Sequence, residues 1–493
     1  MLRSAAATLI QEIADMRSTL SPLELLTPTN YEAMQNQWLK SGRKFFNPTF
    51  TYDLDAIKFS FLQIERILRN IDEFRTYFYR ERYNSALESI LFNSIDIRCQ
   101  ELYYLAVFFQ TILTQQGTPN DHYEEPLTKL YGTVSTNDLA LAKSMTEESP
   151  VQALQKYFTK NPNIPEPSRI KLDKFFRNNL LNFQGMFRES EKNILESQEF
   201  DAQGIATYFQ AVLDYMRQYA QFGLHMSTKE TELPSYQIGI SSKYTAVSVH
   251  AFSTNGKSII GIPADRKVNG LKLIELVGHE LNSHYRSAMS TRNLYRKIIE
   301  YCEKDLLIPL VPFISHSLNE TMSEGLAKLS DIQIAGASGI PKPYQVLAID
   351  FVEQGHNFKE TMEYIFELTR QAHKTEGSAL DNAWRYAYRI FRGQTDTSSH
   401  CGYAFIKDKC YLNGFASVLR EISQDDNLAR ESFVDLLRFS TLTLDEIRLL
   451  ANHENEFNHE LFDNPYRDFS PLANNNHSKS RRDPVNYAAS LLL

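Results

Sequence analysis

Apolar residues recur every three or four positions over most of the chain, and this period predicts α-helices. The clearest stripe begins with Ile57 and Phe61, inside a helical pattern that runs from about 54 to 115. We expect two long helices in that segment. The same period returns over 168–224 and again from about 270 to 450. A chain with this pattern is mainly α-helical.

The period changes in the middle of the chain, where short segments rich in β-branched residues replace the helical pattern. These segments lie at 237–241, 245–252 and 258–262, and the pair Asn255-Gly256 between the last two is a hairpin signal. They directly precede a helical pattern. We therefore expect a mainly α protein with a small β-sheet, an α+β fold in which the sheet stands beside the following helix.

Composition and charge narrow the class of protein. The chain has 493 residues, of which 42% are hydrophobic and 23% charged, values typical of a globular protein. Lysine and arginine number 52 and aspartate and glutamate 60, so the formal charge is 52 − 60 = −8. This acidic balance argues against a general nucleic-acid binder, although a local basic patch stays open.

Three further features bear on the compartment. The four cysteines do not form a disulfide framework, and none of them is paired at C-x-x-C spacing. Acidic residues interrupt the first apolar run too early for a secretory signal. The most apolar stretch, 103–113, is too short to cross a bilayer. We expect a cytoplasmic protein without a membrane partner, or a secreted effector that acts in a host cytosol.

The strongest chemical signal is the segment that contains His279, Glu280 and His284. Two imidazoles with a glutamate beside the first are typical of metallopeptidases, in which histidines bind zinc and the glutamate activates water. The histidines stand five positions apart, however, which in a regular α-helix separates them by about 140°. Both reach one ion only in a widened turn, so we expect an irregular, π-like turn between them. The alternative is a surface helix with two solvated histidines.

A later helical segment supplies carboxylates. Glu320 and Glu324 are four positions apart and share a helix face. One could be the third metal ligand while the other orients a histidine from behind. The alternative is a solvated acidic face, and the spacing does not decide which glutamate would bind.

Several motifs together resemble one known family. The HExxxH segment is followed by Glu324-Gly325-Leu326-Ala327, and then by the segments 392–398 (RGQTDTS) and 405–414 (FIKDKCYLNG). The arm around Asn47-Pro48 fits the same order. This set resembles the family first labelled for a QEGLA motif, whose animal members are the microtubule-associated tyrosine carboxypeptidases. Ser323 stands where the motif name has glutamine, and we expect little effect of that change on catalysis.

The resemblance implies a zincin-like metallopeptidase core with one Zn²⁺ per chain. It implies His279, His284 and Glu324 as ligands and Glu280 as general base. It also implies a substrate with a free C-terminus, such as the α-tubulin tail or microtubules. Glu320 remains an alternative ligand or an orienting residue.

A carboxypeptidase must bind a terminal carboxylate, and arginine does so in a bidentate manner. Arg385, Arg389 and Arg392 have the spacing of one helix face, and Lys407 follows. We expect Arg389, Arg392 and Lys407 to bind substrate, the alternative being a salt-bridged surface. The phenol of Tyr411 could stabilise an oxyanion, or could belong to the core.

These observations predict a zinc-dependent carboxypeptidase that removes a C-terminal tyrosine, or another aromatic or acidic residue, from a protein tail. The alternatives are a metal-dependent endopeptidase and an inert binding protein. We divide the chain into an N-terminal arm (1–45), a helical region (46–230), a catalytic region (231–460) and a flexible tail (461–493).

Overall fold

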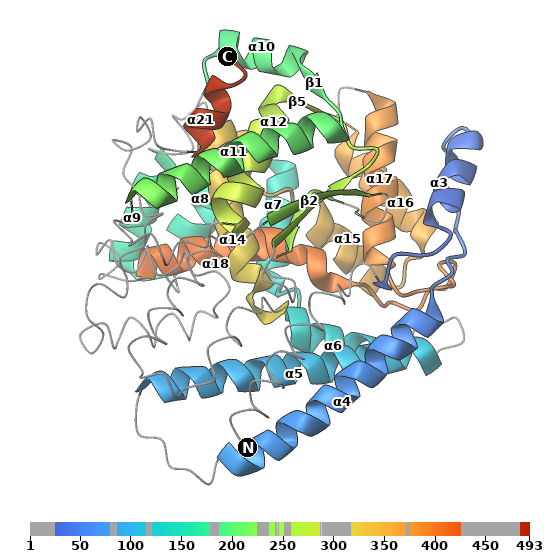
Figure 1. Cartoon of the computed structure of the whole chain (residues 1–493). Helices are drawn as coiled ribbons and strands as arrows, with labels where there is room; N and C mark the ends of the chain where they lie inside the picture. The colour runs from blue at the N-terminus through green and yellow to red at the C-terminus, as the bar shows by residue number, and fades with distance from the viewer. Residues whose placement is uncertain are drawn as a thin grey trace.

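A computed structural model of the chain is mostly helical with two small sheets (Figure 1), which confirms the predicted fold class. The residues that it describes are 25–78, 86–114, 121–162, 164–177, 187–223, 236–241, 244, 246–250, 258–285, 287, 317–370, 375–424 and 484–493. None of the helices in these segments is long and apolar enough to cross a membrane.

The helices follow the apolar period closely. Their bounds are α3 Tyr31–Lys40, α4 Leu54–Phe78, α5 Ala86–Thr114, α6 Asp121–Tyr131, α7 Thr136–Glu147, α8 Pro150–Thr159, α9 Glu166–Phe176, α10 Glu189–Ser197, α11 Ala202–Gly223, α12 Gly270–Leu276, η2 Val277–Tyr285, α14 Ser317–Ala335, η4 Gly336–Gly339, α15 Tyr344–Glu353, α16 Phe358–Thr369, α17 Glu376–Ile390, η5 Ile406–Lys409, α18 Cys410–Gln424 and α21 Pro484–Ser490. The two long helices expected before residue 115 are α4 and α5, which lie against each other at the lower edge of Figure 1.

The main sheet has three strands in the order β2-β4-β3, where β2 is Tyr236–Ser241, β3 is Ser248–His250 and β4 is Ser258–Pro263. β2 runs parallel to β4, and β3 runs antiparallel to it. A second pair, β1 (Glu199–Phe200) and β5 (Val268–Asn269), is antiparallel and leads into α12. The predicted sheet before the histidine-bearing helix is therefore confirmed.

Two clusters of buried side chains form the interior. The larger is built from α3 to α9 and from α14 to α18. The smaller is built from α10 and α11, the main sheet, α12, η2 and α21. α14 contributes to both, with Leu326 in the first cluster and Ile334 in the second. Because α11 packs with the main sheet, the smaller core extends across residue 230, the boundary that the sequence suggested between two regions.

Two glycines let α14 and α18 cross at very short range. A Cβ atom on Gly325 would overlap the backbone of Gly414, and one on Gly414 would overlap the carbonyl of Thr321. Both glycines belong to the motifs that carry the family resemblance, although 89 positions separate them in the sequence. These motif glycines therefore serve helix packing, and their contact fixes α14 relative to the rest of the larger core.

The extended arm expected around Asn47-Pro48 lies along the segment 393–397. Thr49 forms an antiparallel bridge with Asp396, and the hydroxyl of Thr397 donates to the carbonyl of Pro48. Phe50 is buried there and donates its backbone N–H to the carbonyl of Thr395. Two further motif segments thus contact each other.

The end of the chain differs from the flexible tail expected over 461–493. Residues 461–483 lie outside the described part, but α21 forms a buried helix beside α11 (Figure 1). Val485 and Ala488 enter the smaller core, and the Tyr208 hydroxyl donates to the carbonyl of Ala488. Small apolar residues at helical spacing follow Pro484 and explain the helix, a local signal that the polar composition before it concealed.

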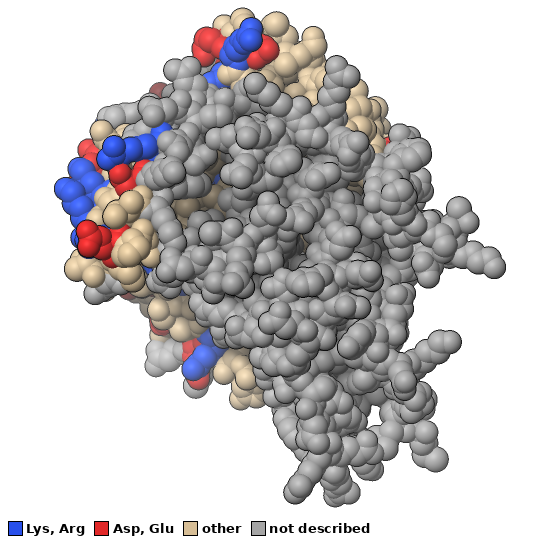
Figure 2. Space-filling model, turned by 90° about the vertical axis from the view of Figure 1, so that its left-hand side faces the viewer, with Lys and Arg blue, Asp and Glu red and all other residues tan. Residues whose placement is uncertain are grey.

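Basic and acidic side chains are interleaved where Figure 2 shows described residues on one face of the molecule. The described residues on this face therefore present both signs of charge close together, as expected of a chain with 52 basic and 60 acidic residues.

Candidate metal centre

The helix that carries the histidines changes its period before the first of them. Asn269 caps α12 by accepting from the backbone N–H of Lys272, and the helix then widens into the π-helix η2. In a π-helix the backbone bonds run from i to i+5, so residues five apart return to one face. The rings of His279 and His284 accordingly lie 5.0 Å apart between centroids. The predicted irregular turn is confirmed.

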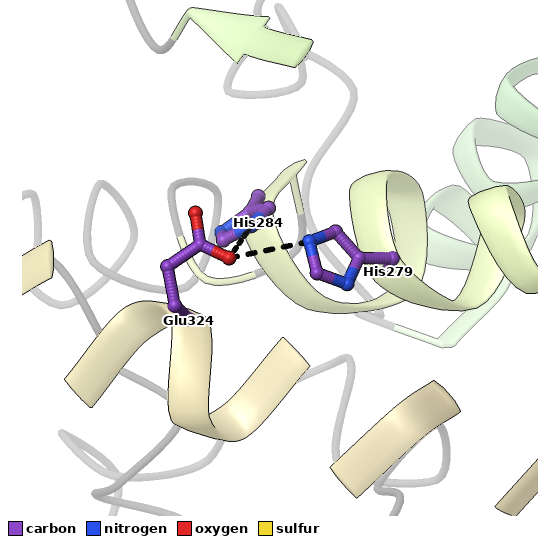
Figure 3. Close-up of side chains that lie close together, drawn as sticks. All are labelled: His279, His284 and Glu324. Atoms are coloured by element: carbon purple, nitrogen blue, oxygen red, sulfur yellow. Dashed lines mark ion pairs between the residues drawn. The ribbon is translucent and has the colours of Figure 1, made fainter. Parts of the chain in front are cut away.

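A neighbouring glycine brings this π-helix close to α14. A Cβ on Gly278 would overlap the side chain of Ile334 on α14. The close approach places Glu324 of α14 opposite the two histidines (Figure 3). Its Oε2 lies 3.3 Å from Nε2 of His279 and 3.9 Å from Nε2 of His284.

These three side chains form a group that could hold a metal ion, the one such group found among the described residues. One ligand atom from each lies within 4.8 Å of the other two. The histidine side chains are 13% and 17% exposed, so the alternative of two solvated histidines does not describe this site. The carboxylate is Glu324, whereas Glu320, one turn earlier, forms an ion pair with Lys407 instead.

Both imidazoles are held from behind by residues of α14. Nδ1 of His279 lies 3.3 Å from Oδ2 of Asp331, and Nδ1 of His284 lies 3.0 Å from Oγ of Ser323. With these partners on Nδ1, both Nε2 atoms face Glu324. The sequence reasoning missed Asp331, although it follows Glu324 by seven positions, two helical turns on one face. It also regarded position 323 as unimportant, yet Ser323 contacts a proposed ligand.

The donor set fits a zinc ion. Two imidazole nitrogens and one carboxylate oxygen are the usual protein ligands of catalytic zinc, with a fourth position left for water. Oε2 of Glu324 is buried and accepts no hydrogen bond of normal geometry, so a ligand atom is available where the two Nε2 atoms converge. The partners on Nδ1 complete the arrangement found around metal-binding histidines.

Burial and neighbouring charges shift the pKa values of this group in different directions. Burial raises the pKa of Glu280 to about 8, with smaller contributions from the carboxylates of Glu324 and Asp331. Burial lowers the pKa of His284 to about 4. For His279 burial also lowers the pKa, but Asp331 and Glu324 outweigh it and raise the value to about 10. Such opposed shifts in one buried group are typical of functional sites.

Tyr411 stands at the start of α18 beside two partly buried cations. Nη2 of Arg389 lies 3.4 Å from the phenolic oxygen, and Nζ of Lys328 lies 5.5 Å from the ring centroid. Burial raises the pKa of Tyr411, and the charge of Glu324 raises it further. Tyr411 is therefore a neutral phenol that interacts with the carboxylate of the metal group.

The expected arginine face is only partly present. Arg389 makes two contacts of 2.6 Å with the carboxylate of Asp408, and Arg385 donates to Asn382. Arg392 does not continue this face, because α17 ends at Ile390 and the chain turns there. The residue is 1% exposed and its guanidinium lies 5.2 Å from the Tyr388 ring centroid. The prediction that the three arginines share one helix face is wrong for Arg392, because the helix is shorter than the pattern suggested.

Comparison with known proteins adds evidence for the site residues that follow the two histidines in the sequence. The family model described as "Microtubule-associated tyrosine carboxypeptidase" matches residues 313–470. Glu324, Arg389, Lys407 and Tyr411 lie inside this segment, and the two histidines precede it. No curated protein and no solved structure matches the chain. The family match confirms the resemblance that the motifs indicate: over residues 313–470 the chain is similar to the microtubule-associated tyrosine carboxypeptidase family, which supports a tyrosine carboxypeptidase-like function.

Proposed function

We propose that the protein is a zinc-dependent carboxypeptidase that removes a C-terminal residue from a protein tail. The observation that carries this proposal is the convergence of His279, His284 and Glu324 on one point, beside the buried carboxyl of Glu280. The family match supports the exopeptidase class independently, because it rests on a segment that excludes both histidines.

Glu280 is suited to the role of general base. A zinc ion held by the three ligands would supply Lewis acidity and lower the pKa of water in its open position. Glu280 would accept a proton from the attacking water and pass it to the leaving amine. A carboxyl whose pKa is raised toward neutral pH by burial holds and releases a proton readily at that pH.

Tyr411 is suited to stabilise the oxyanion that forms on the scissile carbonyl. The guanidinium of Arg389 approaches the phenolic oxygen as a donor, so that oxygen acts as acceptor in this contact. The phenolic hydrogen therefore points elsewhere and can be donated to a developing negative charge. Lys328 links the phenol to the metal group, because its Nζ lies 5.5 Å from the Tyr411 ring centroid and 2.6 Å from Asp331, the partner of His279.

The substrate that we propose ends in tyrosine, or in another aromatic or acidic residue. Lys407, one turn of α14 from Glu324 through its partner Glu320, supplies the positive charge that a terminal carboxylate requires, whereas the charge of Arg389 is already balanced by Asp408. The name of the matching family points to microtubules and to a C-terminal tyrosine, and the motif resemblance makes the C-terminal tail of α-tubulin the specific candidate. Arg392 is a weaker candidate for binding the substrate than its spacing from Arg389 suggested, because it is buried in the core.

The test is intact-mass analysis of tubulin and of tail peptides ending in tyrosine, incubated with the zinc-loaded wild type and with Glu280→Gln. Loss of one C-terminal residue with the wild type alone supports the proposal. Cleavage of a peptide whose C-terminus is amidated would favour an endopeptidase instead. Failure of the protein to bind zinc at one ion per chain would indicate an inert binding protein.

A further inference from the structure

Lys407, the cation proposed to attract a terminal carboxylate, is already paired in the free protein with Glu320 beside the metal group. The ammonium of Lys407 is buried, and its partner Glu320 is 25% exposed. Glu320 precedes the ligand Glu324 by one turn of α14, on the same face. Lys407 also acts electrostatically on Glu324 and His284, lowering the pKa of each. The buried ammonium of Lys407 thus stands next to the metal group, and it is paired with Glu320, whose side chain is partly exposed.

The other two cations near Tyr411 are paired more permanently. Arg389 holds Asp408 through two contacts, and Asp408 is 3% exposed. Lys328 lies 2.6 Å from Asp331, which also contacts His279 and is 6% exposed. Neither aspartate can leave without exposing an unpaired buried charge or releasing a histidine. Glu320 differs, because its side chain is 25% exposed, far more than that of either aspartate.

The spacing suits a substrate with one residue beyond the scissile bond. Four positions on α14 separate Glu320 from Glu324, a rise of about 6 Å along the helix. One residue of an extended substrate spans about 3.3–3.6 Å, to which a hydrogen bond to the ammonium is added. A terminal carboxylate can therefore reach Lys407 while the carbonyl before it lies at the metal group.

We propose that Glu320 is an internal substitute for the C-terminal carboxylate of the substrate, holding Lys407 in the free protein and yielding it when substrate binds. This inference rests on the proposed function and names the residues that select a free C-terminus. A buried ammonium without a partner anion is strongly unfavourable, so Lys407 needs an anion in either state. A terminal carboxylate carries the same negative charge as Glu320, so it can replace Glu320 as the partner of Lys407. A C-terminal amide or an internal peptide bond leaves Lys407 with Glu320, and the site remains blocked.

The test measures binding to the zinc-loaded Glu280→Gln protein, in which cleavage is suppressed. The probes are fluorescently labelled tail peptides ending in tyrosine, one with a free carboxylate and one amidated. Adding Glu320→Gln removes the competing anion, and we expect the free acid to bind about tenfold more tightly while the amide is unaffected. An unchanged or reduced ratio of acid to amide affinity would overturn the proposal.

Variants of Lys407 test the other half of the exchange. Lys407→Met should abolish the preference for the free acid. This change leaves Glu320 without its cation. The double variant Lys407→Met with Glu320→Gln therefore removes both charges of the ion pair together. If the double variant still prefers the acid, the proposal is wrong. Glu148→Gln is the matched control, because Glu148 is 21% exposed and also pairs with a lysine, Lys156, outside the site.

The binding ratio separates this inference from the proposed function. If the wild type trims peptides but Glu320→Gln does not raise the preference for the free acid, the proposed carboxypeptidase activity is supported and the proposed replacement of Glu320 by the substrate carboxylate is wrong. If the preference rises as expected but the wild type trims no peptide, the replacement of Glu320 by the substrate carboxylate is supported and the proposed carboxypeptidase activity is wrong.

Discussion

The side-chain oxygen of Ser323 lies 3.0 Å from Nδ1 of His284, so the residue next to Glu324 supports a second member of the metal group. The same helix carries Asp331, which contacts His279. α14 therefore supplies one proposed ligand and the partners of the other two, while η2 supplies the imidazoles. Rigid packing of α14 against η2 is what brings this set together.

Replacing Ser323 with alanine is expected to weaken metal binding about tenfold, since partners behind a ligand histidine contribute about 10–100-fold to affinity. The hydroxyl fixes the ring and the tautomer of His284, and alanine frees both. Zinc affinity measured by competition with a chelator gives the result. Ser323→Thr keeps the hydroxyl and should restore affinity. Ser330→Ala, at another buried serine of α14, is the control, and an equal loss there would contradict this role.

Asp331→Asn is expected to have a larger effect, toward a 100-fold loss of zinc affinity. The carboxylate contacts His279 and forms an ion pair with the partly buried Lys328, and the amide preserves the shape but removes the charge. Chelator competition and the rate of zinc release report the change. Asp214→Asn alters a hydrogen-bonded aspartate of α11 and should leave both unchanged. Retained affinity in Asp331→Asn would show that the contact does not support the metal.

Gly325→Ala is expected to lower the free energy of unfolding by about 1–3 kcal/mol, the usual effect of adding a methyl group to a closely packed contact. The new Cβ would overlap the backbone of Gly414, where neither helix can move without disturbing the larger core. Thermal or urea unfolding measures the change. Gly377→Ala in α17 has room for the methyl group and should be neutral or stabilising by up to about 1 kcal/mol.

Metal-free Glu280→Gln is expected to be more stable than the metal-free wild type at alkaline pH. The pKa of Glu280 is about 8 in the folded protein against an ordinary 4.5, so the folded state binds the extra proton between these values. Wild-type stability therefore falls as the pH rises through this interval, whereas glutamine has no proton to lose. The difference should be small at pH 4 and reach about 2–4 kcal/mol above pH 8.

Urea unfolding at a series of pH values measures this difference. Glu367→Gln, which removes an exposed carboxylate paired with Arg370, is the control for loss of one negative charge. A difference between Glu280→Gln and the wild type that stays constant with pH would show that Glu280 ionises freely in the folded protein.

The local structure and the chemical types at the centre can be predicted from the order of residues along the chain. The apolar period predicted α4 and α5, the β-branched segments predicted the sheet, and five-residue spacing predicted the widened turn of η2. These features depend on neighbours within a few positions, which is why a one-dimensional pattern contains them. The tail shows the limit of composition as a guide, since a short buried helix follows a polar segment.

Which side chains contact each other depends on how the helices pack. The helical period predicts that Glu320 and Glu324 share a face. The crossing of α14 with η2 then places Glu324 beside the histidines, while Glu320 pairs with Lys407. The end of α17 turns Arg392 into the core, away from the face of Arg389. Such contacts join residues far apart in the chain, and they depend on how helices pack, which the pattern along one segment does not contain.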